Sequence, residues 1–448
     1  MTKVYCIGCG LVTPVGNAPS EVLSAVRAGK SAFRLYDGWP EPYYASLLDR
    51  EGFEGPSFFD HIALQAARTA VQEAGIDASG ARVGLVLSTI KGNIEKIDTD
   101  DVSLAAAAET LAQGLGVKTK PVVVSNACIS GLAALLQGVR MIRSGAYDHI
   151  IVVGAEVQSR FIVTGFQSLK ALSLNPCKPF DADRDGLNVG EAAAAMVLSA
   201  HPVPFDPHPV SENYFSGRDP KNQFPETSTE PALQGDPKNQ FSETSTEPAL
   251  QGDPKNQFPE TSTKPALQGD PKNQFPETST KPAPVIPSEA SVSPWEIVDG
   301  AVRNDANHIS GPSRTGEGSY NALRYVLEGV SAEELAFVNV HGTATRYNDQ
   351  MEAIALNRAG LQEVPVNALK GIFGHTMGAA GILESIVSMK ACDAGVVLPT
   401  QGFSQMGVEP AVNVSAQERK TDKKAFVKLL SGFGGVNGAL LFRKGGAR

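Results

Sequence analysis

The stretch that decides the fold is Pro-Val-Val-Val-Ser-Asn-Ala-Cys-Ile-Ser-Gly, which occupies residues 121–131. Its three valines predict a short buried strand, and the small residues around Cys128 predict a turn into a helix that continues to Arg143. A second apolar run at His149–Val153 predicts the next strand. This order of strand, helix and strand is typical of an α/β protein with a buried sheet.

The same alternation continues on both sides of this stretch. Apolar runs predict further buried strands at residues 82–88, 192–198, 295–302, 335–340 and 424–430. Helical spacing of apolar residues predicts helices at residues 21–28, 61–74, 103–115, 349–359 and 379–394. Both patterns favour an α/β architecture over an all-helical or all-strand one.

Proline is distributed unevenly along the chain, because 18 of the 30 prolines fall between Pro202 and Pro294. Within this block the phrase Asp-Pro-Lys-Asn-Gln-Phe recurs with a period of 17, starting at Asp219, Asp236, Asp253 and Asp270. Each copy carries too few apolar residues to offset chain entropy, and its prolines exclude regular helix or strand. We therefore predict a disordered or polyproline-like insertion over residues 202–294, rather than a solenoid of stacked repeats.

Composition excludes several classes of function. The formal net charge is −9, which argues against a nucleic-acid binder. No apolar run approaches the ~18 residues of a membrane span, and residues 1–16 lack the features of a secretory signal. Five cysteines do not form a disulfide framework, so a cytoplasmic location is expected. Cys6 and Cys9 form a C-x-x-C within a strand-like run, which favours a structural role over a redox or zinc site.

Cys128 is the candidate nucleophile. It lies where a strand gives way to a helix, and free N–H groups and the helix dipole at such a place stabilise a thiolate and can hold an oxyanion. The alternative is a buried core cysteine, which is the commonest role of a free thiol. This segment alone does not decide between the two.

Two histidines lie in loops of small residues that directly follow strands or apolar runs. His341 lies in Val-Asn-Val-His-Gly-Thr-Ala-Thr at residues 338–345, and His375 lies in a glycine-rich loop at residues 369–381. Glycine beside a polar side chain is typical of a backbone that closely approaches a ligand. A single such histidine is more often structural, but two of them together with Cys128 favour catalysis. A further glycine-rich loop follows a strand at residues 430–438.

Together these segments resemble the elongating β-ketoacyl-[acyl-carrier-protein] synthases, or ketosynthases, of the thiolase superfamily. The run Ile-Gly-Cys-Gly-Leu-Val-Thr-Pro-Val-Gly-Asn at residues 7–17 and the segment at residues 179–191 resemble further motifs of that family. The resemblance implies a thiolase-like fold, with two similar βαβ-rich halves packed in α/β/α/β/α layers. We assign residues 1–200 and 295–330 to the N-terminal half and residues 331–448 to the C-terminal half, with the insertion at residues 202–294.

The resemblance also implies an activity, namely decarboxylative Claisen condensation with malonyl-acyl carrier protein in fatty acid, polyene or polyketide biosynthesis. Cys128 would carry the acyl chain as a thioester. His341 and His375 would face the carbonyl of the malonyl thioester, and the N–H groups of Cys128 and Phe433 would hold the oxyanion. No metal or redox cofactor is implied, since the substrates travel on the phosphopantetheine of acyl carrier protein.

Five supporting assignments follow from the same resemblance. Lys370 would help to order the site, with Glu384 as the carboxylate behind it. Thr343 and Thr345 would contact the pantetheine arm, and Phe433 would act as a gate between the acyl pocket and the nucleophile. The expected assembly is a homodimer, or a heterodimer with a related ketosynthase-like subunit.

Two other classes of function remain open. One is a non-condensing, chain-length-factor-like subunit of a ketosynthase heterodimer, although such subunits usually lack the nucleophile that Cys128 would supply. The other is an interaction protein in which the repeats do the work and the remaining chain is a scaffold.

Overall fold

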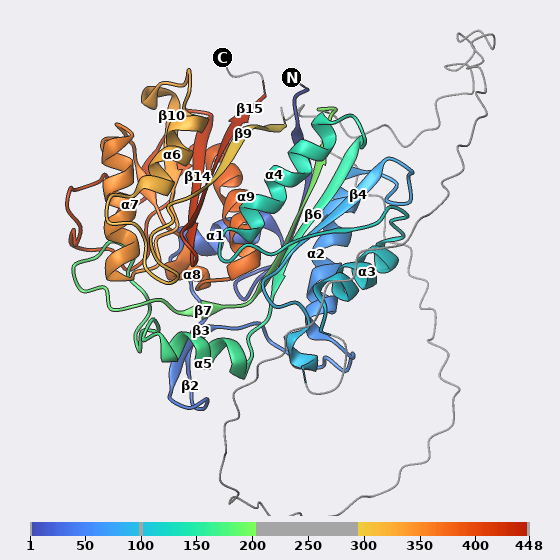
Figure 1. Cartoon of the computed structure of the whole chain (residues 1–448), viewed down its shortest axis with the longest axis horizontal. Coiled ribbons are helices and arrows are strands. Elements are labelled where there is room, and N and C mark those ends of the chain that lie inside the picture. Colours follow the sequence, from blue (N-terminus) through green and yellow to red (C-terminus); the bar gives the residue numbers. More distant parts are fainter. Residues whose placement is uncertain (1, 98–101, 203–293, 446–448) are drawn as a thin grey trace, which may run out of the picture. The chain divides into compact units, whose positions relative to one another are not determined.

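The structure is a computed structural model that describes residues 2–97, 102–202 and 294–445. The predicted insertion therefore lies outside the described residues, except for its end residues at 202 and 294. The described chain contains one large mixed sheet with helices on both faces (Figure 1). This arrangement confirms the predicted α/β class.

The large sheet has ten strands in the order β11-β10-β14-β15-β9-β1-β8-β6-β4-β5. Five of these strands precede residue 203 and five follow residue 293, so each half of the chain supplies a continuous half of the sheet. Among the described strands, only β1 and β9 join the two halves of the sheet, and they pair at just two positions. The strands are β1 (Tyr5–Val12), β4 (Val83–Ser88), β5 (Val122–Val124), β6 (His149–Glu156), β8 (Ala192–Ser199), β9 (Trp295–Asn304), β10 (Leu335–Asn339), β11 (Val366–Asn367), β14 (Ala425–Gly432) and β15 (Val436–Lys444).

Helices cover the sheet in three layers (Figure 1). The helices are α1 (Pro19–Arg27), α2 (Phe58–Ala74), α3 (Leu104–Leu115), α4 (Ser130–Arg143), α5 (Arg160–Ser168), α6 (Glu317–Val326), α7 (Arg346–Arg358), α8 (Lys370–Phe373) and α9 (Ala380–Asp393). One apolar cluster packs α2 and α3 on the N-terminal strands, and another packs α6 and α7 on the C-terminal strands. A third holds α4 and α9 between the two halves of the sheet. The resulting α/β/α/β/α layering confirms the thiolase-like fold expected from the sequence.

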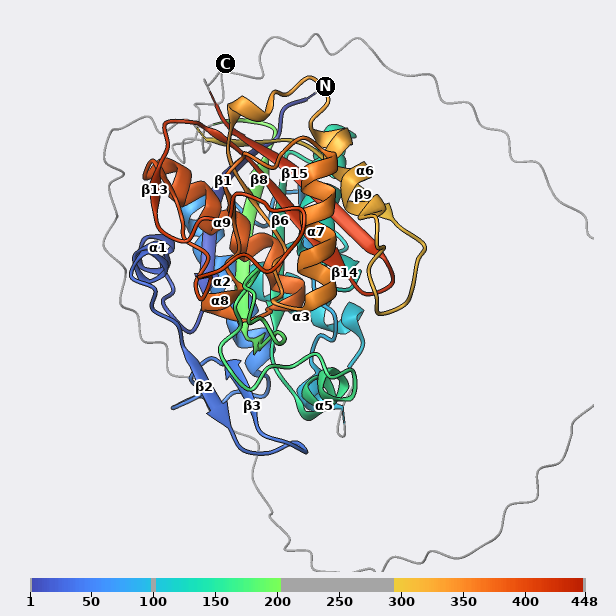
Figure 2. The ribbon, with the colours of Figure 1, turned by 90° about the vertical axis from the view of Figure 1, so that its left-hand side faces the viewer.

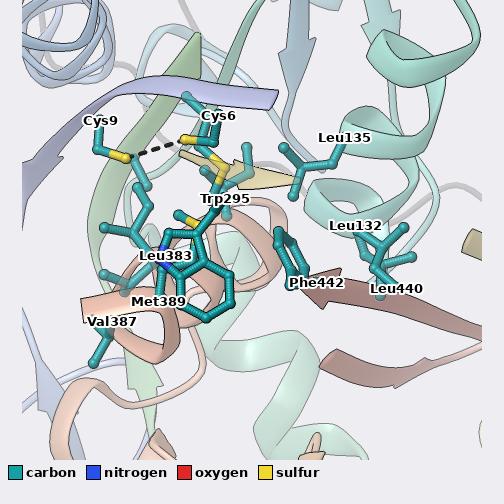
Figure 3. Close-up of a cluster of buried hydrophobic side chains, with 14 of the residues drawn as sticks. Cys6, Cys9, Leu132, Leu135, Trp295, Leu383, Val387, Met389, Leu440 and Phe442 are labelled. Carbon is teal, nitrogen blue, oxygen red and sulfur yellow. Dashed lines mark hydrogen bonds between the residues drawn. The ribbon is translucent and has the colours of Figure 1, made fainter. Parts of the chain in front are cut away.

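The central cluster also contains the C-x-x-C pair. Figure 3 shows Cys6 and Cys9 of β1 above Trp295, with side chains of α4, α9 and β15 around them. The two sulfur atoms lie 3.4 Å apart, and both cysteines are buried and free. Their place among apolar side chains is that of a structural pair.

Smaller strands extend the N-terminal half at one end. They form a three-stranded sheet of β2 (Phe33–Tyr36), β3 (Tyr43–Ser46) and β7 (Val189–Gly190), and Figure 2 shows β2 and β3 grouped with α5 at this end. In the C-terminal half, β12 (Val396–Val397) pairs with β13 (Arg419–Lys420).

Two glycines let α4 and α9 cross closely at the centre of the molecule. A Cβ atom on Gly381 would lie 2.3 Å from the backbone nitrogen of Leu132, and one on Gly131 would lie 2.8 Å from the carbonyl oxygen of Gly378. Contacts this short are not tolerated, so both positions require glycine. The crossing brings the residues that precede α4 next to those that precede α9.

The connection that contains the insertion leaves and rejoins the sheet at one end. Ser199 at the end of β8 and Glu296 at the start of β9 both lie opposite Tyr5 of β1, on its two sides. Since neighbouring strands are about 4.8 Å apart, these two residues are separated by only about 10 Å. A connection far shorter than residues 200–294 could span that gap.

Deleting residues 219–282 is therefore expected to leave the fold and any activity of the parent intact. The deletion shortens the connection about threefold, which changes the closure entropy by only about 1 kcal/mol, in favour of the shorter chain. Circular dichroism and thermal melting of the purified variant check this, with the full chain as control. Loss of folded protein would show instead that the fold of the remaining chain depends on residues 219–282.

Candidate active site

The turn before α4 presents Cys128. Ala127 adopts a positive φ of 45°, and the Ser130 hydroxyl ties the turn together. This hydroxyl accepts from the N–H of Asn126 at 2.7 Å and donates to the carbonyl of Ala127 at 2.6 Å. A strained residue immediately before a nucleophile is typical of a sharp strand-to-helix turn that projects the next side chain.

The backbone of each histidine loop is held by hydrogen bonds to another segment of the chain. His341 follows β10, and its N–H donates to the Glu352 carboxylate at 2.7 Å. His375 follows α8, and its N–H donates to the carbonyl of Asn188 at 2.7 Å, while its own carbonyl accepts from Gly190. The segment at residues 188–190 therefore positions His375, although it belongs to the N-terminal half.

The structure brings the three predicted catalytic side chains together. The sulfur of Cys128 and one ring nitrogen each of His341 and His375 lie within 4.8 Å of one another, and all three residues are buried. The imidazole rings are 5.1 Å apart and nearly perpendicular. Residues separated by up to 247 positions in the chain thus form one cluster, as the sequence predicted.

Hydrogen bonding assigns the proton on His375. The N–H of Met377 donates to Nδ1 at 3.2 Å, so Nδ1 is an acceptor and Nε2 carries the hydrogen of the neutral ring. Nε2 is buried and has no partner among the described residues. Burial, followed by the charges of Lys370 and Lys428, holds the pKa of His375 well below its usual value. His375 is therefore a neutral donor with an unsatisfied N–H inside the cluster.

His341 is neutral for similar reasons. Burial is the largest cause of a pKa well below the ordinary value, and Lys370, His375 and Lys428 act in the same direction. Its Nδ1 has no hydrogen-bond partner within the described part of the chain. Both imidazoles can thus interact with a polar group of a substrate without carrying a full charge.

Burial opposes ionisation of the candidate nucleophile, Cys128. It raises the pKa of the Cys128 thiol to about 11, although Lys370 and the backbone N–H groups of Phe433 and Cys128 act in the other direction. We expected the helix N-terminus to stabilise a thiolate, and the desolvation of the sulfur outweighs that effect. The resting group is a thiol, with two N–H donors directed at it.

Behind the histidines lies a buried group of opposite charges. The ammonium of Lys370 donates to the carbonyl of His341 at 2.6 Å and to Glu384 at 2.9 Å, as the sequence led us to expect of a Lys–Glu pair. A second lysine, Lys428 of β14, contacts the other oxygen of the same carboxylate. Lys428 was not among the predicted site residues, although a lysine within the apolar run at residues 425–430 was a visible signal.

Two acidic residues of α7 were also missed. Glu352 accepts from the N–H groups of His341 and Gly342, and Asp349 accepts from those of Phe180 and Thr343. Burial raises the pKa of Glu352 to about 7 and that of Asp349 to about 6. Each carboxylate fixes the backbone of a loop that borders the site.

A cavity of about 480 Å³ leads to the cluster. Cys128, both histidines, Thr343, Thr345 and Phe433 are among its lining residues. The two threonine hydroxyls are 2.8 Å apart, and Phe433 is 39% exposed. The Phe433 ring contacts that of Phe166, which in turn contacts His375. All the residues predicted to meet substrate therefore border one space.

A thiol and two imidazoles at this spacing also resemble a set of metal ligands. The charges behind them do not suit a cation, because Lys370 and Lys428 share a single carboxylate. These residues therefore fit nucleophilic and hydrogen-bonding chemistry better than metal binding.

Comparison with known families identifies the class of protein. Residues 50–203 match the N-terminal domain of β-ketoacyl synthases, and residues 295–404 match their C-terminal domain, together more than half of the chain. The chain belongs to the β-ketoacyl synthase family. It is accordingly an acyltransferase that forms carbon–carbon bonds, which confirms the family and enzyme class expected from the sequence.

Relatives match the synthase over nearly its whole length. It is 24% identical to 3-oxoacyl-[acyl-carrier-protein] synthase 2 of Vibrio cholerae, over 99% of both chains. It is 23% identical to the ketoacyl synthase alpha subunit of the tetracenomycin polyketide synthase of Streptomyces glaucescens, over 99% of this chain and 97% of the relative.

Solved structures share the fold. A β-ketoacyl synthase from Burkholderia phymatum aligns over the full length of both chains, with a TM-score of 0.71 and 23% identity. A ketosynthase in complex with its chain length factor, from Xenorhabdus doucetiae, aligns over 99% of this chain and 98% of that one, with a TM-score of 0.72 and 20% identity.

The placement of residues 295–330 needs correction. Our division put them in the N-terminal half, whereas β9 pairs along most of its length with β15, and α6 packs within the C-terminal apolar cluster. The family's C-terminal domain also begins its match at residue 295. In the part of the chain that the structure describes, the short pairing of β9 with β1 is the only pairing of this strand with the N-terminal part of the sheet.

Proposed function

We propose that this synthase condenses an acyl group on Cys128 with a malonyl unit held by acyl carrier protein, releasing CO2. The observation that carries the proposal is the buried cluster itself, in which one thiol and two neutral imidazoles meet at a cavity. A thiol supplies covalent catalysis, and neutral imidazoles supply donors for a developing negative charge.

In the first step, the sulfur of Cys128 attacks the thioester carbonyl of an acyl group on the carrier. The N–H groups of Cys128 and Phe433 stabilise the oxyanion, since both are already directed at the sulfur. The bond from the acyl carbon to the carrier sulfur breaks, and the thiol proton ends on the released pantetheine thiol. The acyl chain is then a thioester of Cys128.

In the second step, malonyl thioester enters the same cavity. The Nε2–H of His375 donates to the thioester carbonyl, and His341 lies beside it as the second partner. The bond to the carboxylate breaks, CO2 leaves, and the electron pair forms an enolate that these contacts stabilise. The enolate carbon attacks the acyl carbonyl, the bond from that carbonyl carbon to the sulfur of Cys128 breaks, and the sulfur takes up a proton from solvent.

Other residues complete the site in this proposal. Lys370, with Glu384, holds the backbone carbonyl of His341 and thereby orients that residue. The hydroxyls of Thr343 and Thr345 contact the pantetheine arm, and Phe433 gates the acyl pocket. The mechanism needs no metal or redox cofactor, because charge is handled by hydrogen-bond donors.

The proposed partner is acyl carrier protein, and the proposed assembly is a homodimer or a heterodimer with a related subunit. One similar structure is described as an acyl-carrier protein in complex with its ketosynthase, and another as a ketosynthase with its chain length factor. Among the described residues, no helix is long and apolar enough to cross a membrane. We propose a cytoplasmic location, which the cysteine usage supports. The assembled cluster around Cys128 argues against a non-condensing subunit.

Product analysis tests the proposed function. The synthase, an acyl-loaded carrier and a malonyl-loaded carrier are expected to give a 3-oxoacyl carrier two carbons longer than the acyl donor, together with CO2. Mass spectrometry of the carrier protein detects the product, and omission of either substrate is the control. Acylation of Cys128 without any condensation product would instead favour the non-condensing class.

A further inference from the structure

Lys428 occupies an unusual place for a lysine. It lies in the middle of β14 between Val427 and Leu429, and its side chain is completely buried. An ammonium taken out of water is costly unless charges and hydrogen-bond acceptors compensate it. Its contacts should therefore show what the buried charge is for.

Those contacts point to the active site. The ammonium of Lys428 contacts Oε2 of Glu384 and lies 3.3 Å from the carbonyl oxygen of Val340. Lys370 contacts the other oxygen of Glu384 and the carbonyl of the next residue, His341. A single carboxylate thus holds two ammonium groups, and these hold two consecutive carbonyls.

The two carbonyls belong to the segment that delivers His341 from β10. On this segment's N–H side, the Glu352 carboxylate accepts from His341 and Gly342 at 2.7 and 2.8 Å. The backbone around His341 is therefore held by three charged side chains that come from α7, α8 and β14. Removing any one of them releases one of these constraints.

We propose that Lys428 is a second positioning residue of the synthase, which fixes the backbone at His341 and keeps positive charge behind both imidazoles. The inference rests on the proposed function, and it extends the Lys370–Glu384 pair to a triad of two lysines and one glutamate. With Lys370 alone its ion pair with Glu384 would be neutral, so Lys428 supplies the second positive charge of the triad.

The charges that face the histidines set the expected pH dependence. They are Lys370 on α8, Lys428 on β14, Glu384 on α9 and Glu352 on α7. Cys128 is a further titratable neighbour, and Glu156 of β6 acts on its thiol. Burial lowers the pKa of Lys428 to about 8 even though Glu384 opposes the shift, so the side chain is charged at neutral pH. Both lysines lower the pKa values of the imidazoles.

The sign of the effect follows from these charges. Removing the Lys428 charge raises the pKa of each imidazole, so protonation begins at a higher pH. A proton on Nδ1 of His375 would face the N–H of Met377, which now donates to that atom. The protonated ring cannot keep its position, and the acid side of the activity profile moves toward neutral pH.

The test compares Lys428→Met, which removes charge and donor, with Lys428→Gln, which retains a donor for the carbonyl of Val340. Lys424→Met is the matched control, since Lys424 contacts the carbonyl of Cys392 and does not line the cavity. CO2 release from malonyl-loaded carrier is measured between pH 5 and pH 9, with kcat and KM determined separately. Intact-mass measurement follows acylation of Cys128.

We expect Lys428→Met to lower kcat for CO2 release by about 10- to 100-fold with little change in KM, as for a misplaced catalytic group. The acid limb of its pH profile for CO2 release moves to higher pH, while acylation of Cys128 proceeds as in the parent. Lys428→Gln recovers part of kcat but keeps the shifted limb. If either folded variant has the kcat of the parent and the same acid limb of the pH profile, the inference is overturned. If Lys428→Met does not fold, Lys428→Gln alone decides. Absence of CO2 release from the parent would instead overturn the proposed function.

Discussion

The Cys128→Ala variant forms no acyl-enzyme and no condensation product, while it folds like the parent. The substitution removes the sulfur that the cavity, both imidazoles and two N–H groups surround. Alanine retains the Cβ atom in a tightly packed turn, so little packing is lost. Incubation with an acyl-loaded carrier, followed by intact-mass spectrometry, shows whether the acyl mass is transferred to the protein.

The control for Cys128→Ala is a second buried cysteine, since all five cysteines are buried. Cys177 is unsuitable, since its thiol donates to the carbonyl of Lys370 at 3.2 Å and so touches the site. Cys392 of α9 lies outside the cavity, and burial raises its pKa to about 12. Cys392→Ala should therefore acquire the acyl group as the parent does. An acyl adduct that persists on Cys128→Ala would rule out Cys128 as the nucleophile.

The second large effect is expected from His375→Ala. Loss of the Nε2–H donor should slow CO2 release from malonyl-loaded carrier by at least ~100-fold, the range measured for single donors to a developing oxyanion. Acylation of Cys128 is expected to continue, because the N–H groups of Cys128 and Phe433 remain. The two half-reactions are followed separately, by CO2 release and by intact mass.

Two further variants sharpen this prediction. His375→Asn retains an N–H donor in a smaller side chain and should recover part of the lost decarboxylation. His61→Ala changes an exposed histidine on α2, whose ring packs on Phe53 and Phe58 outside the cavity, and should behave as the parent does. Parental CO2 release by His375→Ala would mean that His375 serves structure and not the proposed step.

The fold was predictable where local pattern decides the structure. The valines of β5 and the apolar spacing of α4 and α9 predict elements that the structure places within about two residues of their expected bounds. Neither β15 nor α6 was predicted. Gly434 and Gly435 mark a loop, but they form the turn between β14 and β15, and that pairing is visible only in three dimensions. Long-range pairing also decided the place of β9.

For the candidate site, the three clustered side chains were predictable, but the charged residues that hold them were not. Cys128, His341 and His375 could be found because each lies in a run of small residues beside a predicted element. Lys428 and Glu352 stayed hidden, since a charge in an apolar stretch becomes meaningful only when its partners are known. The pKa of the Cys128 thiol is raised, whereas the sequence led us to expect a stabilised thiolate, and the reason is related. The helix end is a local feature, while burial depends on the whole fold.

The ends of four central strands lie together, and this has a practical consequence. Tyr5, Ser199, Trp295 and Lys444 are neighbours in the sheet, whereas the other end of β9 adjoins Gly434 and the cavity. Strands of eight to ten residues separate these places by about 25–30 Å. A dye, an affinity handle or a solid support attached beside Tyr5, Ser199 or Lys444 would therefore stay clear of the cavity that leads to Cys128. The synthase could be immobilised there and still receive a carrier protein from solution.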